Sequence, residues 1–352
     1  MAAGDGTVMR TRGMAAWRVL LVLLLLAGIV TAAVAWQDWS RFRDAPLAIP
    51  AEGITLDIPR GTGFKRIVAM LQERQLSAAP AIYWRGLAER MGVTGRLHAG
   101  EYVLAQGLTP QRLLDMLARG EVRQHHFTLV EGWTFRQLRE ALDRTDGLLH
   151  ATQGLDDAAV MQRIGHPEEH PEGRFLPETY AFIKGDSDLD ILRHAWQAMD
   201  QFLDTAWPQR DADLPLETPQ QALVLASIVE KETGRADERP RIAGVFVRRL
   251  KIGMPLATDP TIIYGLGDAF DGNLRRRDLR EDGPYNTYLR AGLPPTPIAM
   301  PGRAAITAAL HPAEGRELYF VARGDGSGGH VFSASLTEHN RAVACHQLKR
   351  CR

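Results

Sequence analysis

Two acidic side chains, Glu230 and Glu232, stand at the end of the segment best suited to acid–base chemistry. Residues 218–234 predict one helix, with Thr218 as its N-cap and Gly234 as a left-handed C-cap. The interior of this segment is apolar and predicts burial. Carboxylates in the last turn oppose the helix dipole, which favours cations there. Acid at that end of a buried helix therefore indicates a functional requirement, and a carboxyl group can serve as a general acid.

Helical geometry separates these two carboxyl groups. At about 100° per residue, Glu230 lies beside the small side chains of Ala222 and Ala226, and Glu232 lies about 200° away. Small neighbours leave space for a ligand, and apolar surroundings raise the pKa of a carboxyl group. We therefore predict Glu230 as the catalytic acid. Because the carboxylates point apart, they do not form the pair that flanks the bond in a paired-carboxylate glycosidase.

Glu232 is predicted to have a supporting role. It follows Lys231 directly and lies close in sequence to Arg235 and Arg239. This pattern favours ion pairs, so Lys231 and Glu232 are interpreted as structural support for Glu230.

Three loops downstream of the helix combine Tyr, Asn, Thr and Asp with Gly and Pro. They cover residues 253–265, 283–288 and 292–295. The polar and aromatic side chains suit sugar recognition, and Gly and Pro fix irregular backbone around a site. One such loop is typical of an ordinary turn, but three together favour a binding groove. The predicted substrate contacts are Thr258, Asp259, Tyr264, Tyr285, Asn286, Thr287 and Tyr288.

Other polar residues are weaker candidates. Glu172 and Glu178 lie in a segment without a regular period and are interpreted as connector residues. His330 and His339 could reach the groove, but structural roles fit them equally well. No lysine of a phosphate loop follows the glycine-rich stretch 324–329, which therefore predicts a hairpin turn.

Composition excludes several classes of function. Basic and acidic residues balance at 42 each among 352 residues, so no global field favours nucleic acid. A hydrophobic fraction of 45% is typical of a folded protein, here with room for two or three domains. No Cys/His spacing matches a zinc site, and we predict no metal and no cofactor. Cys345 and Cys351 would form a disulfide only outside the cytosol and with a turn between them.

The N-terminus predicts a membrane anchor. Residues 19–36 are uncharged and span about 27 Å as a helix, enough for the hydrocarbon core of a bilayer. Trp17 and Trp36 bracket this run, and the arginines of residues 1–18 predict a cytoplasmic tail. The rest of the chain is then exported. A cleaved signal peptide is the alternative, because residues 33–35 form an Ala-x-Ala pattern.

The exported part is predicted to contain a stalk at residues 37–52, a small unit at 53–124 and a mixed α+β domain at 125–345. The small unit either binds a ligand or acts as a spacer. Its pattern predicts strands at 53–58 and within 97–104, and helices at 64–75, 79–91 and 110–118. The larger domain is expected to hold a strand at 125–131, an irregular segment at 171–182, and helices at 134–144, 148–162, 188–207, 218–234 and 241–250.

Several motifs taken together are specific. They are residues 225–233 (LASIVEKET), 258–261 (TDPT), 284–288 (PYNTY), 292–295 (GLPP), 318–322 (LYFVA), 329–333 (GHVFS) and 338–340 (EHN). With these motifs the sequence resembles the endolytic murein transglycosylase (MltG/YceG-like) family over residues 50–343. It departs from the family pattern at Arg248, Ala257, Gly283, Thr296 and Met300.

The resemblance implies an α+β protein with an N-terminal transmembrane helix, a small LysM-like α/β subdomain and a mixed α+β catalytic domain. It also implies cleavage between N-acetylmuramic acid and N-acetylglucosamine inside nascent peptidoglycan strands, which leaves 1,6-anhydro ends and limits strand elongation. Glu230 would protonate the departing oxygen and then accept the proton of the C6 hydroxyl.

Partners and location follow from the same resemblance. The implied partners are peptidoglycan strands, the membrane through a single-pass anchor, and peptidoglycan synthases of the elongation or division machinery, with no nucleic acid. The implied location is the bacterial inner membrane, with a cytoplasmic N-terminus and a periplasmic catalytic domain.

Three alternatives stay open. One is a hydrolase in which Asp259 activates water, which would give reducing ends in place of anhydro ends. Another is a peptidoglycan-binding scaffold without turnover. The third, a small-molecule lyase, is disfavoured because an exported domain without a cofactor motif suits it poorly.

Overall fold

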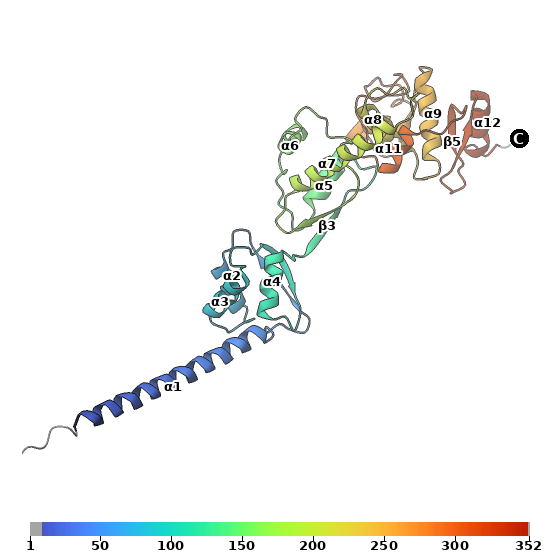
Figure 1. Cartoon of the computed structure of the whole chain (residues 1–352). Helices are drawn as coiled ribbons and strands as arrows, with labels where there is room; N and C mark the ends of the chain where they lie inside the picture. The colour runs from blue at the N-terminus through green and yellow to red at the C-terminus, as the bar shows by residue number, and fades with distance from the viewer. Residues whose placement is uncertain (1–8, 351–352) are drawn as a thin grey trace, which may run out of the picture. The chain divides into compact units, whose positions relative to one another are not determined.

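The computed structural model describes residues 9–350, with side chains from residue 17 onward. Internal contacts divide the chain into two compact units, residues 1–124 and 125–352, and each is described by itself (Figure 1). Helix and sheet are mixed, as predicted. Cys351 lies outside the described residues, so a disulfide between Cys345 and Cys351 stays a prediction.

Helix α1, Met9–Asp44, contains a stretch that is long and apolar enough to cross a membrane by length and composition. The helix continues beyond Trp36, where the predicted span ends, through the first part of the predicted stalk. Charged residues change the polarity of a helix without interrupting its backbone hydrogen bonds. The helix ends only as Pro46 approaches, because proline disfavours helical backbone in the residue before it.

The end of α1 packs onto the rest of the first unit. The hydroxyl of Tyr83 donates to Asp38 at 2.9 Å, and the ring of Phe42 meets Trp84 edge-on at 5.3 Å. These contacts explain why the helix persists into a polar stretch of sequence.

The first unit has the predicted order of strand, helix, helix, strand and helix. β1, Ile54–Ile58, pairs antiparallel with β2, Gly100–Leu104. α2, Phe64–Glu73, α3, Ala81–Met91, and α4, Pro110–Arg119, complete the unit. Alternation in β1 buries Leu56 and Ile58, and Thr109 caps α4 as predicted. The LysM-like character of this unit stays a prediction.

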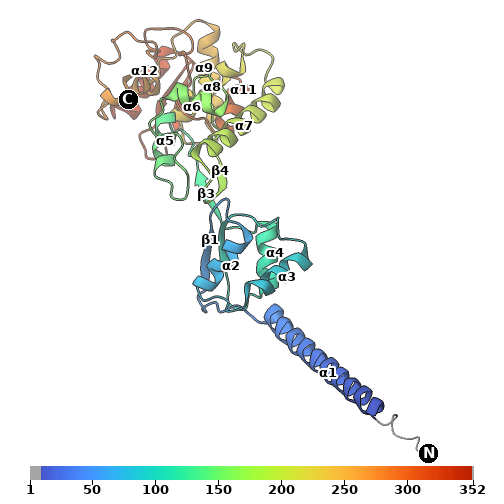
Figure 2. The same cartoon turned by 90° about the vertical axis from the view of Figure 1, so that its left-hand side faces the viewer.

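The second unit begins with a paired strand and three helices. β3, Gln124–Thr128, pairs with β4, Thr179–Ile183, as Figure 2 shows. Around this pair lie α5, Phe135–Asp143, α6, Asp157–Ile164, and α7, Asp188–Ala206.

Two expectations for this region were wrong. The predicted irregular segment 171–182 ends in strand β4, whose short apolar alternation is visible only with its partner in place. The predicted helix at 148–162 is helical only from Asp157, because buried Asp188 accepts the backbone N–H groups of Ala151 and Thr152 and holds them in a turn.

Helix α8, Pro219–Glu232, forms the centre of the remaining core. It packs against α9, Arg239–Lys251, and α11, Arg303–Leu310 (Figure 1). Thr218 caps α8 as predicted, with its hydroxyl accepting from the N–H of Gln221 at 3.2 Å. The C-terminal prediction was wrong: Thr233 is the C-cap, in extended backbone, and Gly234 has no left-handed conformation.

Three further elements complete this unit. α10, Asp259–Leu266, starts inside a stretch predicted as a loop, with Pro260 in its first turn. β5, Tyr319–Ala322, and β6, His330–Ser333, form an antiparallel pair around the predicted glycine-rich turn. α12, Leu336–His346, packs on this hairpin and begins with a capping box formed by Ser335 and Glu338.

Candidate active site

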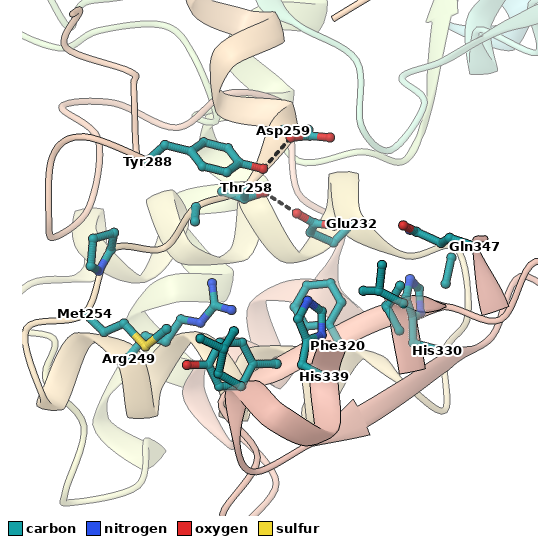
Figure 3. A pocket seen from close by; sticks show the side chains of 17 residues that line it. Glu232, Arg249, Met254, Thr258, Asp259, Tyr288, Phe320, His330, His339 and Gln347 are labelled. Carbon is teal, nitrogen blue, oxygen red and sulfur yellow. Dashed lines mark hydrogen bonds between the residues drawn. The ribbon is translucent and has the colours of Figure 1, made fainter. Parts of the chain in front are cut away.

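A cavity of about 670 Å³ opens where α8, α9, α10, the β5–β6 hairpin and α12 converge (Figure 3). Its polar lining includes groups from each of these elements and from the loop after α10. They are Glu232, Arg249, Thr258, Asp259, Tyr288, Tyr319, His330, His339 and Gln347.

Glu232 brings a carboxyl group into this cavity from the last turn of α8. The hydroxyl of Thr258 donates a hydrogen bond to that carboxyl group. Burial raises the pKa of Glu232, and the negative charge of Asp259 acts in the same direction. The Thr258 hydrogen bond, His330 and Arg249 oppose that rise. Glu232 is therefore a half-buried, hydrogen-bonded acid that lines an open space.

Glu230 does not line the cavity, and its side chain is only 6% exposed. It accepts from Arg239 at 3.3 Å and from the backbone N–H of Gly302 at 3.0 Å. Gly302 precedes α11, so the carboxyl group lies at the N-terminal end of that helix. Burial raises the pKa of Glu230 too.

The expected surroundings of the two acids are thus reversed. Arg239, predicted near Glu232, pairs with Glu230. Ala222 and Ala226 are fully buried in the core that α8 forms with α9 and α11, so they leave no open space for a ligand. Helical periodicity predicts that the two side chains point in different directions. It does not predict which of these directions is covered by elements that come later in the chain.

The backbone at Gly302 is fitted to this arrangement. A Cβ atom there would clash with the side chain of Glu131, so a larger residue would require the Glu131 carboxyl group to move. Arg239 also lies 3.8 Å from Glu131. Glu230 and Glu131 therefore surround one arginine at the start of α11.

Three of the predicted substrate contacts line the cavity together. Thr258 and Asp259 begin α10, and Tyr288 lies in the loop that follows. The hydroxyl of Tyr288 donates to Asp259 at 2.5 Å (Figure 3). Burial and the carboxylate of Asp259 raise the pKa of Tyr288, which stays a hydrogen-bond donor.

The other four predicted contacts, Tyr264, Tyr285, Asn286 and Thr287, do not line this cavity. The hydroxyl of Thr287 accepts from the N–H of Thr258 at 3.2 Å, so it fixes the start of α10. Asn286 bonds two carbonyls through Nδ2 and accepts the N–H groups of Tyr288 and Leu289. These two residues support the cavity-lining residues beside them.

Tyr264 and Tyr285 form an edge-to-face pair, with centroids 4.9 Å apart, against the core. Tyr285 bonds to Thr296 at 2.7 Å. Tyr264 donates to Glu172 at 3.1 Å. Both tyrosines therefore pack against each other, and Tyr285 also lines a second cavity of about 240 Å³ with Asn286.

Lys231 reaches the backbone carbonyl of Gly132 at 3.2 Å. It thus contacts the loop before α5 and forms no ion pair with a carboxylate among the described residues. Its place agrees with a supporting role, although its partner differs from the one expected.

Glu172, interpreted from sequence as a connector, is buried and has a specific set of partners. It accepts from the N–H of Phe135 at 3.0 Å and from Tyr264. Burial raises the pKa of Glu172 to about 7, against these hydrogen bonds, which lower it. Glu178 pairs with Arg303 at 2.6 Å, in agreement with a connecting role.

Sequence reasoning missed Arg249 and Tyr319 and left His330 and His339 undecided. All four line the cavity. Nδ1 of His330 lies 2.7 Å from Glu238, whose carboxylate also accepts the backbone N–H of His330 at 3.0 Å. The motif GHVFS that contains His330 was recognised, but nothing local to it predicts that the hairpin folds over the end of α8.

One group of side chains has metal-ligand spacing, in a different part of the unit. Ligand atoms of Asp143, His150 and Asp188 lie within 4.8 Å of one another. Both oxygens of Asp188 already accept backbone N–H groups of the 148–156 turn. The carboxylate of Asp188 is therefore engaged in holding the fold.

Comparison with known proteins places this site in a family. Residues 56–345 match the model of the YceG-like family. The chain belongs to this family. A relative from Bacillus subtilis, named endolytic murein transglycosylase, is 31% identical over 82% of the chain and 83% of its own length.

Two other proteins are similar to this YceG-like chain. An endolytic murein transglycosylase from Streptococcus pneumoniae is 28% identical over 83% of the chain, which spans 58% of that protein's length. A crystal structure of a yceG-like protein from Listeria monocytogenes is 29% identical over 83% of the chain and 99% of its own, with a TM-score of 0.49.

Proposed function

We propose that the chain is a membrane-anchored endolytic lytic transglycosylase that cleaves between N-acetylmuramic acid and N-acetylglucosamine inside peptidoglycan strands. Family membership and the names of the relatives support the reaction class. One observation carries the assignment of the acid: Glu232 brings a carboxyl group with a raised pKa into the cavity. Glu230, the acid predicted from sequence, is the alternative assignment and is engaged by Arg239 and Gly302.

In the first step, protonated Glu232 gives its proton to the departing glycosidic oxygen as the bond to C1 breaks. A raised pKa keeps this group protonated closer to neutral pH. The hydroxyl of Thr258 donates to Glu232 and stabilises the carboxylate that the transfer leaves.

In the second step, the carboxylate of Glu232 accepts the proton of the C6 hydroxyl. The C6 oxygen then bonds to C1 and closes the 1,6-anhydro ring, so the carboxyl group returns to its starting state without water. One carboxyl group in two successive roles is sufficient for this reaction.

Asp259 is suited to stabilise the positive charge that develops at C1 between these steps. Tyr288 holds its carboxylate by a hydrogen bond at 2.5 Å. The same geometry supports the second candidate function, a hydrolase in which Asp259 activates water, because Asp259 and Glu232 line one cavity.

The test uses the full chain in detergent with purified peptidoglycan strands, and mass spectrometry of the products. Anhydro ends from the wild type and no product from Glu232→Gln are expected, with Glu217→Gln as an exposed control from the start of α8. Reducing ends that disappear in Asp259→Asn would favour the hydrolase. Loss of product in Glu230→Gln alone would return the assignment to Glu230, and no product from the wild type would favour a scaffold.

We further propose that α1 anchors the chain in the inner membrane with its N-terminus in the cytoplasm and residues 37–352 in the periplasm. The arginines before the apolar run and the length of the helix support this orientation. Unit 53–124 is proposed to be LysM-like, supported by its order of elements, and synthases of the wall remain the proposed partners. Reporter fusions at the C-terminus, active only in the periplasm or only in the cytoplasm, test the orientation.

A further inference from the structure

Arg249 is a buried cation in the cavity that acts on the carboxyl group of Glu232 through space but forms no direct ion pair with a described residue. It is 7% exposed. Its Nε donates to the carbonyl of Leu318 at 2.7 Å, and Nη1 donates to the carbonyl of Leu256. Nη2 has no hydrogen-bond partner among residues 9–350, and Figure 3 shows the guanidinium directed into the cavity.

A ring stack continues from this guanidinium along the cavity wall. The guanidinium lies 5.5 Å from the centroid of Tyr319, and Tyr319 stacks on His339 at 5.2 Å. Nδ1 of His339 is buried and has no hydrogen-bond partner within residues 9–350. Burial and the charge of Arg249 lower the pKa of His339, so its imidazole is neutral near pH 7. This wall therefore offers a fixed cation and an uncharged hydrogen-bonding ring.

The opposite side of the cavity carries the acids. Glu232 and Asp259 likewise form no ion pair with a described side chain. The cavity is thus divided between a side that performs acid–base chemistry and a side that is ready for an anion.

The chemistry of the substrate identifies that anion, an argument that rests on the proposed function. In a strand with stems, the carboxyl group of N-acetylmuramic acid is taken up in the amide bond to the peptide, so the sugars carry no charge, whereas the peptide stems carry free carboxylates. A buried guanidinium without a directly paired anion costs free energy, and its two free Nη2 protons suit a carboxylate. We propose that Arg249, with His339 beside it, binds a carboxylate of the peptide stem, so that the enzyme selects strands bearing acidic stems.

A purely structural Arg249 makes a different prediction. Its bonds to Leu318 and Leu256 join α9 to strand β5 and to the loop before α10. If that were its whole role, replacement would lower stability and turnover of every strand equally. A purely structural role of Arg249 would not make the enzyme discriminate between charged and neutral stems.

The experiment compares two substrates with the full-length wild type: strands with free stem carboxylates and the same strands with those carboxylates amidated. We expect kcat/KM to be about tenfold or more higher for the free carboxylates, the size of a charge-assisted hydrogen bond. Arg249→Gln should cleave the charged and amidated strands at equal rates, and His339→Gln should reduce the preference.

Arg248→Gln is the matched control. Arg248 is the preceding residue of α9 and also bonds backbone carbonyls, those of Ala313 and Glu317, but it does not line this cavity. The Arg248→Gln variant should keep the full preference for charged over amidated strands, even if its stability is lower than that of the wild type. Equal cleavage of charged and amidated strands by the wild type would overturn the inference even if Arg249→Gln fails to fold. No cleavage of any strand by the wild type would instead count against the proposed function.

Discussion

Glu230 and Glu232 are separated by one residue on α8, yet the first is held by Arg239 and the amide of Gly302 while the second accepts from Thr258 in the cavity. Burial raises the pKa of both carboxyl groups, so titration alone does not distinguish their roles. Their partners differ, because Glu230 is bound by an arginine and the amide that precedes α11, whereas Glu232 lines the cavity, and this difference favours Glu232 as the acid that meets a substrate. The different roles of Glu230 and Glu232 can be tested by measuring the stability and the turnover of variants at each position.

Glu230→Gln should lower the free energy of unfolding by about 1–3 kcal/mol, since Arg239 would lose its close ionic partner in a buried setting. The amide oxygen of glutamine can still accept from Gly302, so the fold should persist. Turnover by the folded variant should remain within a few-fold of the wild type. Urea unfolding and product release from the same preparation check this expectation, and unchanged stability with complete loss of product would contradict it.

Thr258→Val should shift the pH dependence of turnover. A general acid must be protonated, so kcat/KM falls as the pH rises through the pKa of Glu232. The Thr258 hydroxyl lowers that pKa by favouring the carboxylate. Its removal should therefore move the descending limb of the profile to higher pH.

The control for that shift is Thr261→Val. The hydroxyl of Thr261 bonds to the carbonyl of Thr258 and to Thr287 and does not reach Glu232. This variant should lose stability but keep the position of the limb. A limb that stays in place in Thr258→Val, or moves to lower pH, would refute the assignment of Glu232.

Glu172 should make stability depend on pH. Its pKa is raised from 4.5 to about 7 in the folded protein, so the folded state binds more protons than the unfolded state between these values. Its stabilising contribution is fully present below the unfolded pKa and is lost as the pH rises through the folded pKa. The loss amounts to about 3 kcal/mol at most, by about 1.4 kcal/mol per pKa unit.

Glu172→Gln tests this expectation, because glutamine can accept from Phe135 and Tyr264 without titrating. Unfolding measured at several pH values between about 5 and 8 should show a smaller decline with rising pH in the variant than in the wild type. Parallel curves would show that Glu172 does not titrate in this window.

Asn286→Ala should act on stability first and on turnover through Tyr288. The side chain of Asn286 is buried and forms four hydrogen bonds within the loop after α10. Their removal should cost about 2–4 kcal/mol, by about 1 kcal/mol per bond and the burial of unpaired groups. Thermal unfolding and kcat/KM should fall together, whereas a higher KM at unchanged stability would restore the predicted role as a substrate contact.

Features that depend on residues close together in the sequence were predicted correctly. Thr218 and Pro219 begin α8, Thr109 begins α4, and the glycines at 324–329 turn the chain between β5 and β6. The apolar N-terminal run is helical, and the motifs identified the family. Caps, turns and periodic apolar faces depend on neighbours within a few residues, so the sequence alone determines them.

Only the tertiary structure decided which acid reaches the cavity. Ala222 and Ala226 were expected to leave room for a ligand, but both are fully buried in a core to which α9 and α11, later in the chain, contribute. The β5–β6 hairpin and α12 instead build the cavity beside Glu232 and contribute Tyr319, His330 and His339. A helical wheel fixes the direction of a side chain, whereas its burial and partners depend on long-range packing that no local pattern records.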